Sequence, residues 1–367
     1  MQTIKFVAKD KNQKEFAAEL SKRVRQYFKK NNTSKFGGTK IIVKAALMLT
    51  LYIAPLVLVF TIDFPAWAAL LLMVVMGIGK AGIGMGVMHD AAHGSFSQRK
   101  WLNNLMANSM FLLGSSLINW KIQHNVLHHT YPNVYEYDND IDTKALIRLS
   151  KHADHHRVFK YQYIFGPLLY SFMTLARFVG DFQQLAQYNR MGALKIYDSS
   201  FAKNLWTMII SKLLYIGVFL VLPFFLTDFA WWQILIGFFI IHAVASMIMG
   251  TVFQLAHVVE GMDEPLPNEE GVINNQFFVH QLETTSDFSS KKNLLGWYVG
   301  GLDFQAIHHL FPNVSHVHYY DLAHIVRETA KEYGQPYNLQ KSFFTALRSH
   351  LVMLKKLGQQ AQPKAIV

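Results

Sequence analysis

The chain has 367 residues, of which 51% are hydrophobic, 14% aromatic and only 16% charged. Soluble domains average about 25% charged residues, so this composition indicates a membrane protein. Cysteine is absent, which excludes disulfides, iron–sulfur clusters, thiolate zinc sites and blue-copper sites. The formal net charge of +11 is compatible with nucleic acid, anionic lipid or an acidic protein partner, and its distribution along the chain must decide among them.

The first forty residues are polar, and their many lysines and arginines are spread among acidic residues. This stretch lacks the early apolar segment of a signal peptide. It runs directly into membrane-grade sequence, so we interpret residues 1–40 as a basic cytosolic tail that follows the positive-inside rule. No nucleic-acid partner is expected.

Four stretches are apolar and long enough, at about 1.5 Å per residue, to cross a hydrocarbon core of about 30 Å. They are predicted transmembrane helices, at about residues 41–62, 66–88, 205–226 and 231–256. Their short connections, 63–65 and 227–230, contain no lysine or arginine, whereas 89–204 and 257–367 contain many. The sequence therefore predicts an integral, multi-pass membrane protein with both termini and both large segments on the cytosolic side.

Two further apolar stretches, 102–118 and 164–179, are predicted to be amphipathic helices that lie in the membrane interface. Asparagine and serine interrupt the first, and the second holds Pro167 and Arg177. If both stretches crossed the membrane, residues 124–129 would lie outside the cell. The predicted organisation is therefore a membrane domain over 41–318, followed by cytosolic helices over 319–367 that show helical spacing of apolar residues.

The second predicted span contains several closely spaced glycines, which let helices approach one another, and also Lys80. We expect Lys80 to snorkel to the cytosolic headgroups, the alternative being a buried functional charge. The helix would then continue beyond the bilayer and carry His89 and His93 about 13–20 Å into a cytosolic helical cap.

Histidines cluster at the cytosolic ends of the predicted spans and in the segments that follow. Eight of them fall into four groups: His89 and His93; His124, His128 and His129; His257; and His308 and His309. In a helix, His124 and His128 share one face, and His129 lies about 100° further round. Three clustered groups in one compartment predict metal ligation, while His257 is included for its position after the fourth span and for the resemblance described below.

Other histidines are interpreted differently. His152, His155 and His156 lie in a polar connector, and we expect them not to bind metal. His242 lies inside the fourth predicted span with Ser246 one turn later, so it is expected to make interhelical hydrogen bonds.

The ligand set narrows the choice of metal. Imidazole suits zinc, copper, iron and nickel. A zinc enzyme needs three or four protein ligands, so eight histidines without cysteine fit two irons better. Neutral imidazoles also leave an iron pair more cationic than carboxylates would, which favours a strong oxidant directed at an unactivated C–H bond.

From the first span to His318, the sequence resembles the integral-membrane fatty acid desaturase family. The similarity is carried by the four-span layout and by HDAAH at 89–93, HNVLHH at 124–129, HQLETTSDF at 280–288, GGLDFQ at 300–305 and QAIHHLFP at 305–312. Gln305, in place of a histidine, resembles the front-end (delta-5 and delta-6 type) desaturases and related bacterial acyl-lipid or linoleoyl-CoA enzymes. Unlike many front-end members, the amino-terminal segment has no fused cytochrome b5 domain with a His-Pro-Gly-Gly motif.

The resemblance implies an oxygen-dependent enzyme that introduces a cis double bond into a long-chain fatty acyl group, carried by CoA or by a lipid. It further implies two ferrous ions held by the eight histidines, O2 as co-substrate, and an external electron donor of the ferredoxin or cytochrome b5 type. Asp90, Gln305 and His280 are candidates to orient the ligands or to bind the metal themselves. The acidic run of Glu136, Asp138, Asp140 and Asp142 is interpreted as a solvated loop, with ligand orientation as the alternative.

Two alternatives stay open at this point. A membrane di-iron hydroxylase or ketolase uses similar histidine groups, and the spacing of these groups separates it poorly from a desaturase. A non-enzymatic membrane metal carrier would place polar ligands within the spans, whereas these histidines follow the spans. For an acyl substrate, we expect an apolar tunnel that is reached from the membrane.

Overall fold

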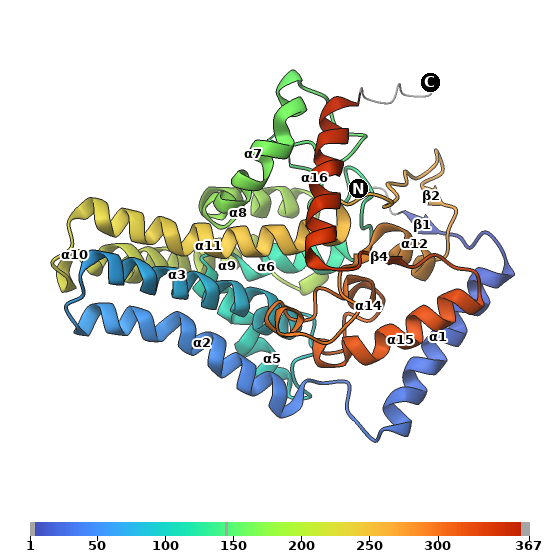
Figure 1. Cartoon of the computed structure of the whole chain (residues 1–367), viewed down its shortest axis with the longest axis horizontal. Coiled ribbons are helices and arrows are strands. Elements are labelled where there is room, and N and C mark those ends of the chain that lie inside the picture. The colour runs from blue at the N-terminus through green and yellow to red at the C-terminus, as the bar shows by residue number, and fades with distance from the viewer. Residues whose placement is uncertain (1–3, 144–145, 361–367) are drawn as a thin grey trace. The chain divides into compact units, whose positions relative to one another are not determined.

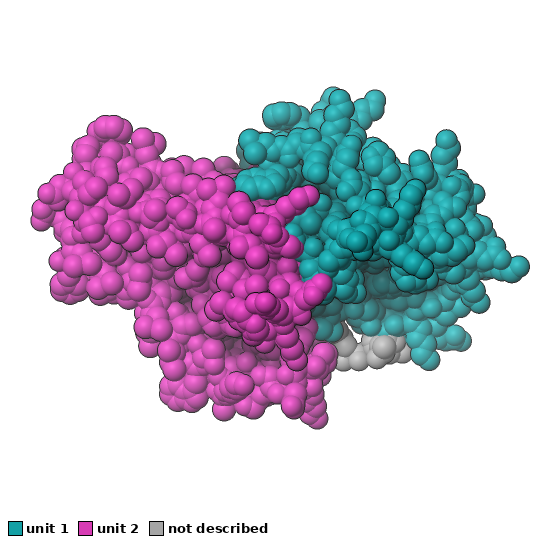
Figure 2. Space-filling model, turned by 90° about the horizontal axis from the view of Figure 1, so that it is seen from below, with its two compact units in different colours: residues 1–37, 123–166, 252–367 teal, residues 38–122, 167–251 magenta. Residues whose placement is uncertain are grey.

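The computed structural model describes residues 4–143 and 146–360. Helices dominate both of its compact units, so the predicted all-α fold is confirmed (Figure 1). Unit 1 comprises residues 1–37, 123–166 and 252–367, and unit 2 comprises 38–122 and 167–251 (Figure 2).

Among the described residues, four helices are long and apolar enough to cross a membrane, and they cover the predicted spans: Gly38–Thr61, Ala66–Ala92, Phe201–Leu226 and Trp231–His257. The first is α2 (Gly38–Thr61) and the fourth is α11 (Trp231–His257). The second joins α3 (Ala66–Ile83), a π-helical turn (Gly84–Met88) and α4 (His89–Ala92). The third joins α9 (Phe201–Ile216), a π-helical turn (Gly217–Val221) and α10 (Pro223–Leu226).

Helices α2 and α3 run side by side in unit 2 (Figure 1). A Cβ atom added at Gly79 would lie 2.6 Å from the backbone nitrogen of Tyr52 in α2. One added at Gly77 would lie 2.7 Å from the Cβ of Val244 in α11. The prediction that these glycines allow close helix packing is confirmed.

The prediction that Lys80 snorkels to the headgroups is wrong. Its side chain is 0% exposed. The Lys80 Nζ lies 2.8 Å from the hydroxyl of Tyr215, and 3.1 and 3.3 Å from the two ring nitrogens of His242. Helices α9 and α11 therefore supply polar partners that make burial less costly than the sequence of α3 alone suggests.

His242 makes the interhelical hydrogen bonds predicted for it. Its Nδ1 lies 2.8 Å from the Thr174 hydroxyl and its Nε2 lies 3.0 Å from the Tyr215 hydroxyl. The Thr174 hydroxyl also lies 2.7 Å from that of Ser246. We call Lys80, Thr174, Tyr215, His242 and Ser246 the lysine cluster.

The two stretches predicted to lie in the interface are not among the four long apolar helices of the described chain. The first comprises α5 (Lys100–Ala107), a 3-10 turn (Asn108–Leu113) and α6 (Leu117–Trp120). The second comprises α7 (Gln162–Leu169), a 3-10 turn (Tyr170–Phe172) and α8 (Met173–Arg190). A buried ion pair fastens α8 to α9, with the Lys212 Nζ 2.8 Å from a carboxylate oxygen of Asp181.

Unit 1 is built around a core that the amino-terminal helix shares with a carboxyl-terminal one. Helix α1 (Lys11–Lys30) packs on α15 (Tyr319–Glu332), with Phe16, Leu20 and Val24 in the same buried cluster as residues of α15. Part of the predicted basic tail is thus packed helix. The other helices and 3-10 turns are α12 (Phe277–Thr284), α13 (Leu294–Tyr298), α14 (Gln305–Leu310), α16 (Phe343–Gln359), Arg157–Tyr161 and His316–His318, and unit 2 adds the 3-10 turn Ala193–Tyr197.

Two short parallel ladders join distant parts of unit 1. Strand β1 (Lys5–Phe6) pairs with β2 (Val272–Ile273), with Lys5 opposite Val272. Strand β3 (Ser286–Asp287) pairs with β4 (Asn338–Leu339), with Ser286 opposite Asn338. The second ladder holds Asp287 beside the start of α14, which carries two of the predicted metal ligands.

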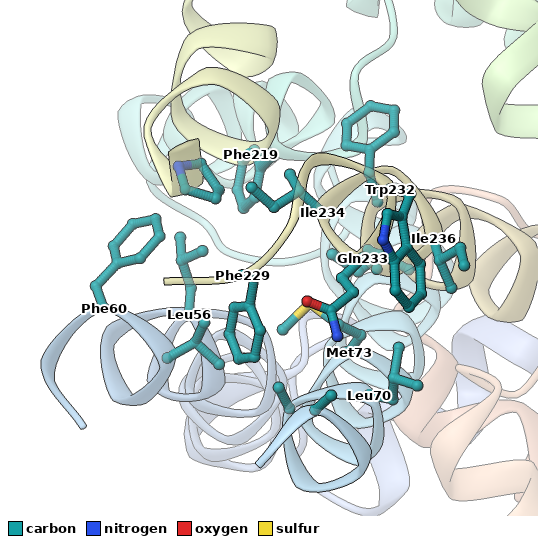
Figure 3. A pocket seen from close by; sticks show the side chains of 17 residues that line it. Leu56, Phe60, Leu70, Met73, Phe219, Phe229, Trp232, Gln233, Ile234 and Ile236 are labelled. Atoms are coloured by element: carbon teal, nitrogen blue, oxygen red, sulfur yellow. The ribbon is translucent and has the colours of Figure 1, made fainter. Parts of the chain in front are cut away.

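Unit 2 contains an apolar pocket of ≈ 780 Å³ near its two hairpin turns (Figure 3). Phe60, Met73 and Trp232 line it, and the Gln233 amide is a polar group in its wall. Met73 precedes His89 by sixteen residues in the same long helix, so about 24 Å separates them along its axis. The pocket therefore lies far along this helix from His89, and the predicted substrate tunnel stays a prediction.

Candidate metal centre

A π-helical turn, Lys121–His128, carries the second histidine group. The backbone N–H of His129 donates to the carbonyl of His124 at 2.9 Å, which is the five-residue spacing of this wider turn. The ring centroid of His124 lies 5.3 Å from that of His128 and 4.7 Å from that of His129. An ordinary α-helix would have pointed His129 away, so the wider turn is what brings all three imidazoles together.

Three buried histidines of unit 1 share one hydrogen-bonding pattern. His128, His257 and His309 each have Nδ1 next to an oxygen: a carboxylate of Asp138 at 3.0 Å, the carbonyl of Thr284 at 3.3 Å and the amide oxygen of Gln281 at 2.9 Å. An oxygen acceptor on Nδ1 fixes the tautomer, so the Nε2 lone pair is left for another partner.

Asp138 is the strongest of these anchors. It is fully buried, and it also accepts the backbone N–H of Asn133 at 2.9 Å and that of Asp140 at 3.0 Å. Burial by itself lowers the pKa of His128, but the attraction of the Asp138 and Asp140 carboxylates outweighs it and raises that pKa to about 9. The same negative charge that stabilises a proton on His128 would stabilise a metal cation there.

His309 is held in its neutral form. Burial first, and then the charges of the neighbouring imidazoles, lower its pKa well below the usual value for histidine. The ring is therefore neutral at physiological pH, which is the form that binds metal. Gln281 fixes it, since the amide accepts from His309 and its Nε2 donates to the His129 carbonyl at 3.2 Å.

The Nε2 atoms of His124, His129 and His308 form a second group of closely spaced imidazole nitrogens. The Nε2 of His129 lies 3.2 Å from that of His124 and 2.9 Å from that of His308. The Nδ1 of His308 is anchored by the Tyr319 hydroxyl at 3.0 Å. Three imidazole nitrogens at such distances cannot all hold protons, so this arrangement also favours a shared cation.

Helix α14 is positioned by a buried carboxylate. Asp287 accepts the backbone N–H of Ala306 at 2.9 Å, which satisfies a free donor in the first turn of the helix. It also accepts the Tyr337 hydroxyl. Burial raises the Asp287 pKa to about 7 despite these hydrogen bonds. The contact with the Ala306 N–H fixes the direction of α14, and therefore the positions of His308 and His309.

The first histidine group lies in unit 2. The rings of His89 and His93 are 4.9 Å apart, and both lie against Trp120, at 5.6 and 5.9 Å. The preceding π-helical turn, Gly84–Met88, rotates this end of the helix relative to the rest of α3. Asp90 is buried, and its carbonyl accepts from the N–H of Ser95 at 2.8 Å.

The remaining candidates differ in how near they come to the histidines. The Gln305 Nε2 lies 3.2 Å from the His257 Nε2, and its Oε1 has no hydrogen-bond partner. His280 is fully buried, with its ring 4.8 Å from that of Phe6. His152 and His155, predicted not to bind metal, lie against the backbone carbonyls of Glu264 and Gly358 at 3.0 and 2.9 Å.

The residues present fit a metal. Within unit 1, His128, His257 and His309 can each offer one ligand atom with all of them within 4.8 Å of one another, and His124, His128 and Asp140 form a second such group. The Nε2 atoms of His128 and His309 are buried without a hydrogen-bond partner. A buried nitrogen of this kind is costly unless it has a ligand, so a cation explains the arrangement best.

Several side chains that orient the histidines were not the preferred prediction. The interpretation of the acidic run as a solvated loop is wrong for Asp138, which is 0% exposed, and its contact with His128 agrees with the alternative of ligand orientation. Gln281 and Tyr319 were not singled out, although Gln281 falls within the 280–288 motif. The Asn133 side chain donates to the carbonyl of His257 at 3.1 Å, and it too was missed.

Fold and site together define an all-helical membrane protein with a buried, cysteine-free histidine centre that fits a metal. The family model described as fatty acid desaturase matches residues 65–341, and the chain belongs to that family. It is an enzyme that desaturates fatty acids.

Three relatives show how far the similarity extends. The sn-1 linoleoyl-lipid 6-desaturase of Arthrospira platensis is 31% identical over 96% of this chain and 95% of its own length. An enzyme of the same description from Synechocystis is 30% identical over 97% and 98%. The acyl-lipid (8-3)-desaturase of Physcomitrium patens is 32% identical over 95% of this chain and 73% of its own.

Proposed function

We propose that this desaturase introduces a cis double bond into a long acyl chain by means of two iron ions held by histidine. The ligands in this proposal are His89, His93, His124, His128, His129, His257, His308 and His309. The observation that carries it is the shared pattern of three of them, His128, His257 and His309, whose Nδ1 atoms face oxygen acceptors, which leaves Nε2 for a metal. The iron would supply the activation of O2 and the removal of hydrogen from two adjacent methylenes.

The chain's own groups then have separate tasks. Asp138, Gln281 and Tyr319 hold the imidazoles in place, and Asp138 also adds negative charge beside the cation. Burial of the histidines excludes water from the reacting groups. Gln305 offers an amide at the His257 Nε2, where an imidazole would add another ligand. Each group therefore orients or shields the metal rather than reacting with the substrate.

The substrate we propose is an acyl group carried by a membrane lipid. The full-length match to two enzymes named as sn-1 linoleoyl-lipid 6-desaturases supports a lipid-bound linoleoyl chain and carbon 6 as the first position to test. The reaction would then place the new double bond between the carboxyl end and the existing ones, as the front-end subgroup does.

Expression in a host that supplies linoleoyl lipids tests this function. Gas chromatography–mass spectrometry of the host's fatty acids should show a new double bond, and His309→Ala should abolish it. A hydroxyl or keto product would identify a hydroxylase or ketolase instead, while an unchanged lipid profile with bound metal would favour a metal carrier. A new double bond at a position other than carbon 6 would keep the enzyme class and replace the proposed position.

We further propose that four spans place both termini and unit 1 on the cytosolic side. The absence of lysine and arginine from the two hairpin turns supports this orientation. The chain has no cysteine, so a single cysteine at Asn125 can be labelled without background. Labelling from the cytosolic side alone is expected, and labelling only from the outer face would reject the arrangement.

The electron donor we infer is an acidic ferredoxin or a cytochrome b5. The net charge of +11 supports an acidic partner, and α1 contributes exposed lysines to unit 1. Electrostatic steering weakens as salt rises, so the rate of reduction by such a donor should fall with ionic strength. A rate that is independent of salt would contradict this choice.

A further inference from the structure

A small helix of unit 1, α13, presents large apolar side chains to the outside. Leu294 is 78% exposed, Leu295 37% and Trp297 40%. Around the helix Leu294 lies between Leu295 and Trp297, so the three side chains form one band of apolar surface. Single exposed apolar residues are ordinary, but a contiguous group of this kind marks a surface that binds something apolar.

The exposed group is held in place by its own turn. The Asn293 side chain caps α13 by accepting the Gly296 N–H at 2.7 Å, and its Nδ2 donates to the Lys291 carbonyl at 3.1 Å and to the Ser289 hydroxyl at 3.1 Å. On the inner side of the helix, a Cβ atom at Gly296 would collide with the Asp303 carboxylate. The apolar side chains are thus directed outward by a fixed scaffold.

Positive charge borders the same surface. Lys291 and Lys292 precede the capping residue Asn293 of α13, and both are exposed. Lysine next to leucine and tryptophan is the combination that suits the headgroup region of a bilayer, where the cation meets anionic lipid and the indole sits between water and hydrocarbon.

We propose that residues 291–297 form an interfacial anchor that inserts Leu294, Leu295 and Trp297 into the headgroup layer of a membrane containing anionic lipid. The protein has four apolar helices that can cross a bilayer, so a lipid surface is available to it. A second copy of the chain fits less well, because a symmetric contact would bring the same lysines face to face.

Site-directed fluorescence on the full-length protein tests this anchor. Leu294→Cys is labelled with an environment-sensitive fluorophore, and the protein is reconstituted in nanodiscs of phosphatidylcholine with phosphatidylglycerol. Two quenchers are compared: a nitroxide on the upper part of the lipid acyl chain, and iodide in the water. Val7→Cys is the matched control, because Val7 is a 49% exposed aliphatic residue of unit 1 near Lys5 and Lys9 whose neighbours Phe6 and Ala8 are only partly exposed.

The expected result is nitroxide quenching and loss of iodide quenching at position 294, with the reverse at position 7. Adding Lys291→Gln and Lys292→Gln to the Leu294→Cys protein should reduce nitroxide quenching in the anionic discs. Equal iodide quenching at both positions would overturn the proposal. So would shielding from iodide that appears without nitroxide quenching and grows with protein concentration, since this would show that a second copy covers the patch.

Discussion

The molecule contains two buried polar clusters that use similar residues in different ways. In the lysine cluster of unit 2, the Lys80 amine, the Tyr215 hydroxyl and both nitrogens of His242 find partners among themselves and Thr174. In the histidine cluster of unit 1, the Nδ1 atoms of His128, His257 and His309 are anchored to oxygen. The Nε2 atoms of His128 and His309, however, have no hydrogen-bond partner.

The difference separates a structural cluster from a metal-binding one. The lysine cluster is complete as it stands, so it needs no further component to make its burial tolerable. The histidine cluster buries the Nε2 atoms of His128 and His309 without a hydrogen-bond partner, and a cation would complete it. A count of buried histidines would not have distinguished the two, whereas their hydrogen-bond partners do.

Removal of a histidine that lacks an Nε2 partner should have the largest effect. His309→Ala is expected to lower desaturation and metal affinity by more than about 100-fold, beyond the range typical for residues that only orient a ligand. Metal analysis of the purified protein and fatty acid analysis of the host measure the two losses. His152→Ala, which alters a histidine held by a backbone carbonyl, is the control and should retain both.

The anchoring carboxylate should matter less than the ligand itself. Asp138→Asn keeps the size of the side chain but removes the negative charge beside His128, so metal affinity should fall by about 10–100-fold. Competition with a chelator gives this affinity. Glu136→Gln, an exposed acid of the same run, should leave it unchanged. Equal losses in both variants would mean that the run acts through its overall charge.

Substitutions in the lysine cluster should change the stability of the protein but not its metal content. His242→Leu leaves the Lys80 amine with fewer partners, and unfolding should become easier by about 1–3 kcal/mol. Lys80→Met removes the buried amine while Tyr215, His242 and Thr174 can still bond one another, so it should be neutral or stabilising. Thermal unfolding and metal analysis of the two variants test this prediction. Loss of metal in either variant would show that the lysine cluster is not purely structural.

His350 offers a smaller test of the same reasoning, because it is a buried histidine whose Nδ1 is held by a backbone carbonyl. Its Nδ1 donates to the Val258 carbonyl at 2.7 Å, and burial lowers its pKa to about 4. As the pH falls below the ordinary histidine pKa, the unfolded state binds a proton that the folded state does not yet bind. The free energy of unfolding therefore decreases from that pH down to the pKa of the folded state. Compared with His350→Gln, the wild type should lose about 1.4 kcal/mol more per pH unit across that window, as measured by thermal unfolding. Parallel acid profiles would contradict the assignment.

Local patterns in the sequence were sufficient for part of this structure. The four spans follow from runs of apolar residues, and the three clustered histidine groups follow from spacing, whereas His257 was included for its position and for the family resemblance. The burial of Lys80 was not predicted because its partners, Tyr215 and His242, are distant in sequence. The burial of Asp138 was not predicted because it depends on a loop that folds inward. The π-helical turn at 121–128 was missed as well, since a helical pattern does not reveal whether its turns are widened.

The most direct test of the central claim is metal analysis of purified wild-type protein beside His309→Ala and His242→Leu. We predict about two iron ions per chain in the wild type and in His242→Leu, and a marked loss in His309→Ala, since eight histidines are enough for two ions. One zinc ion and no iron in the wild type, or equal iron in all three proteins, would contradict the account.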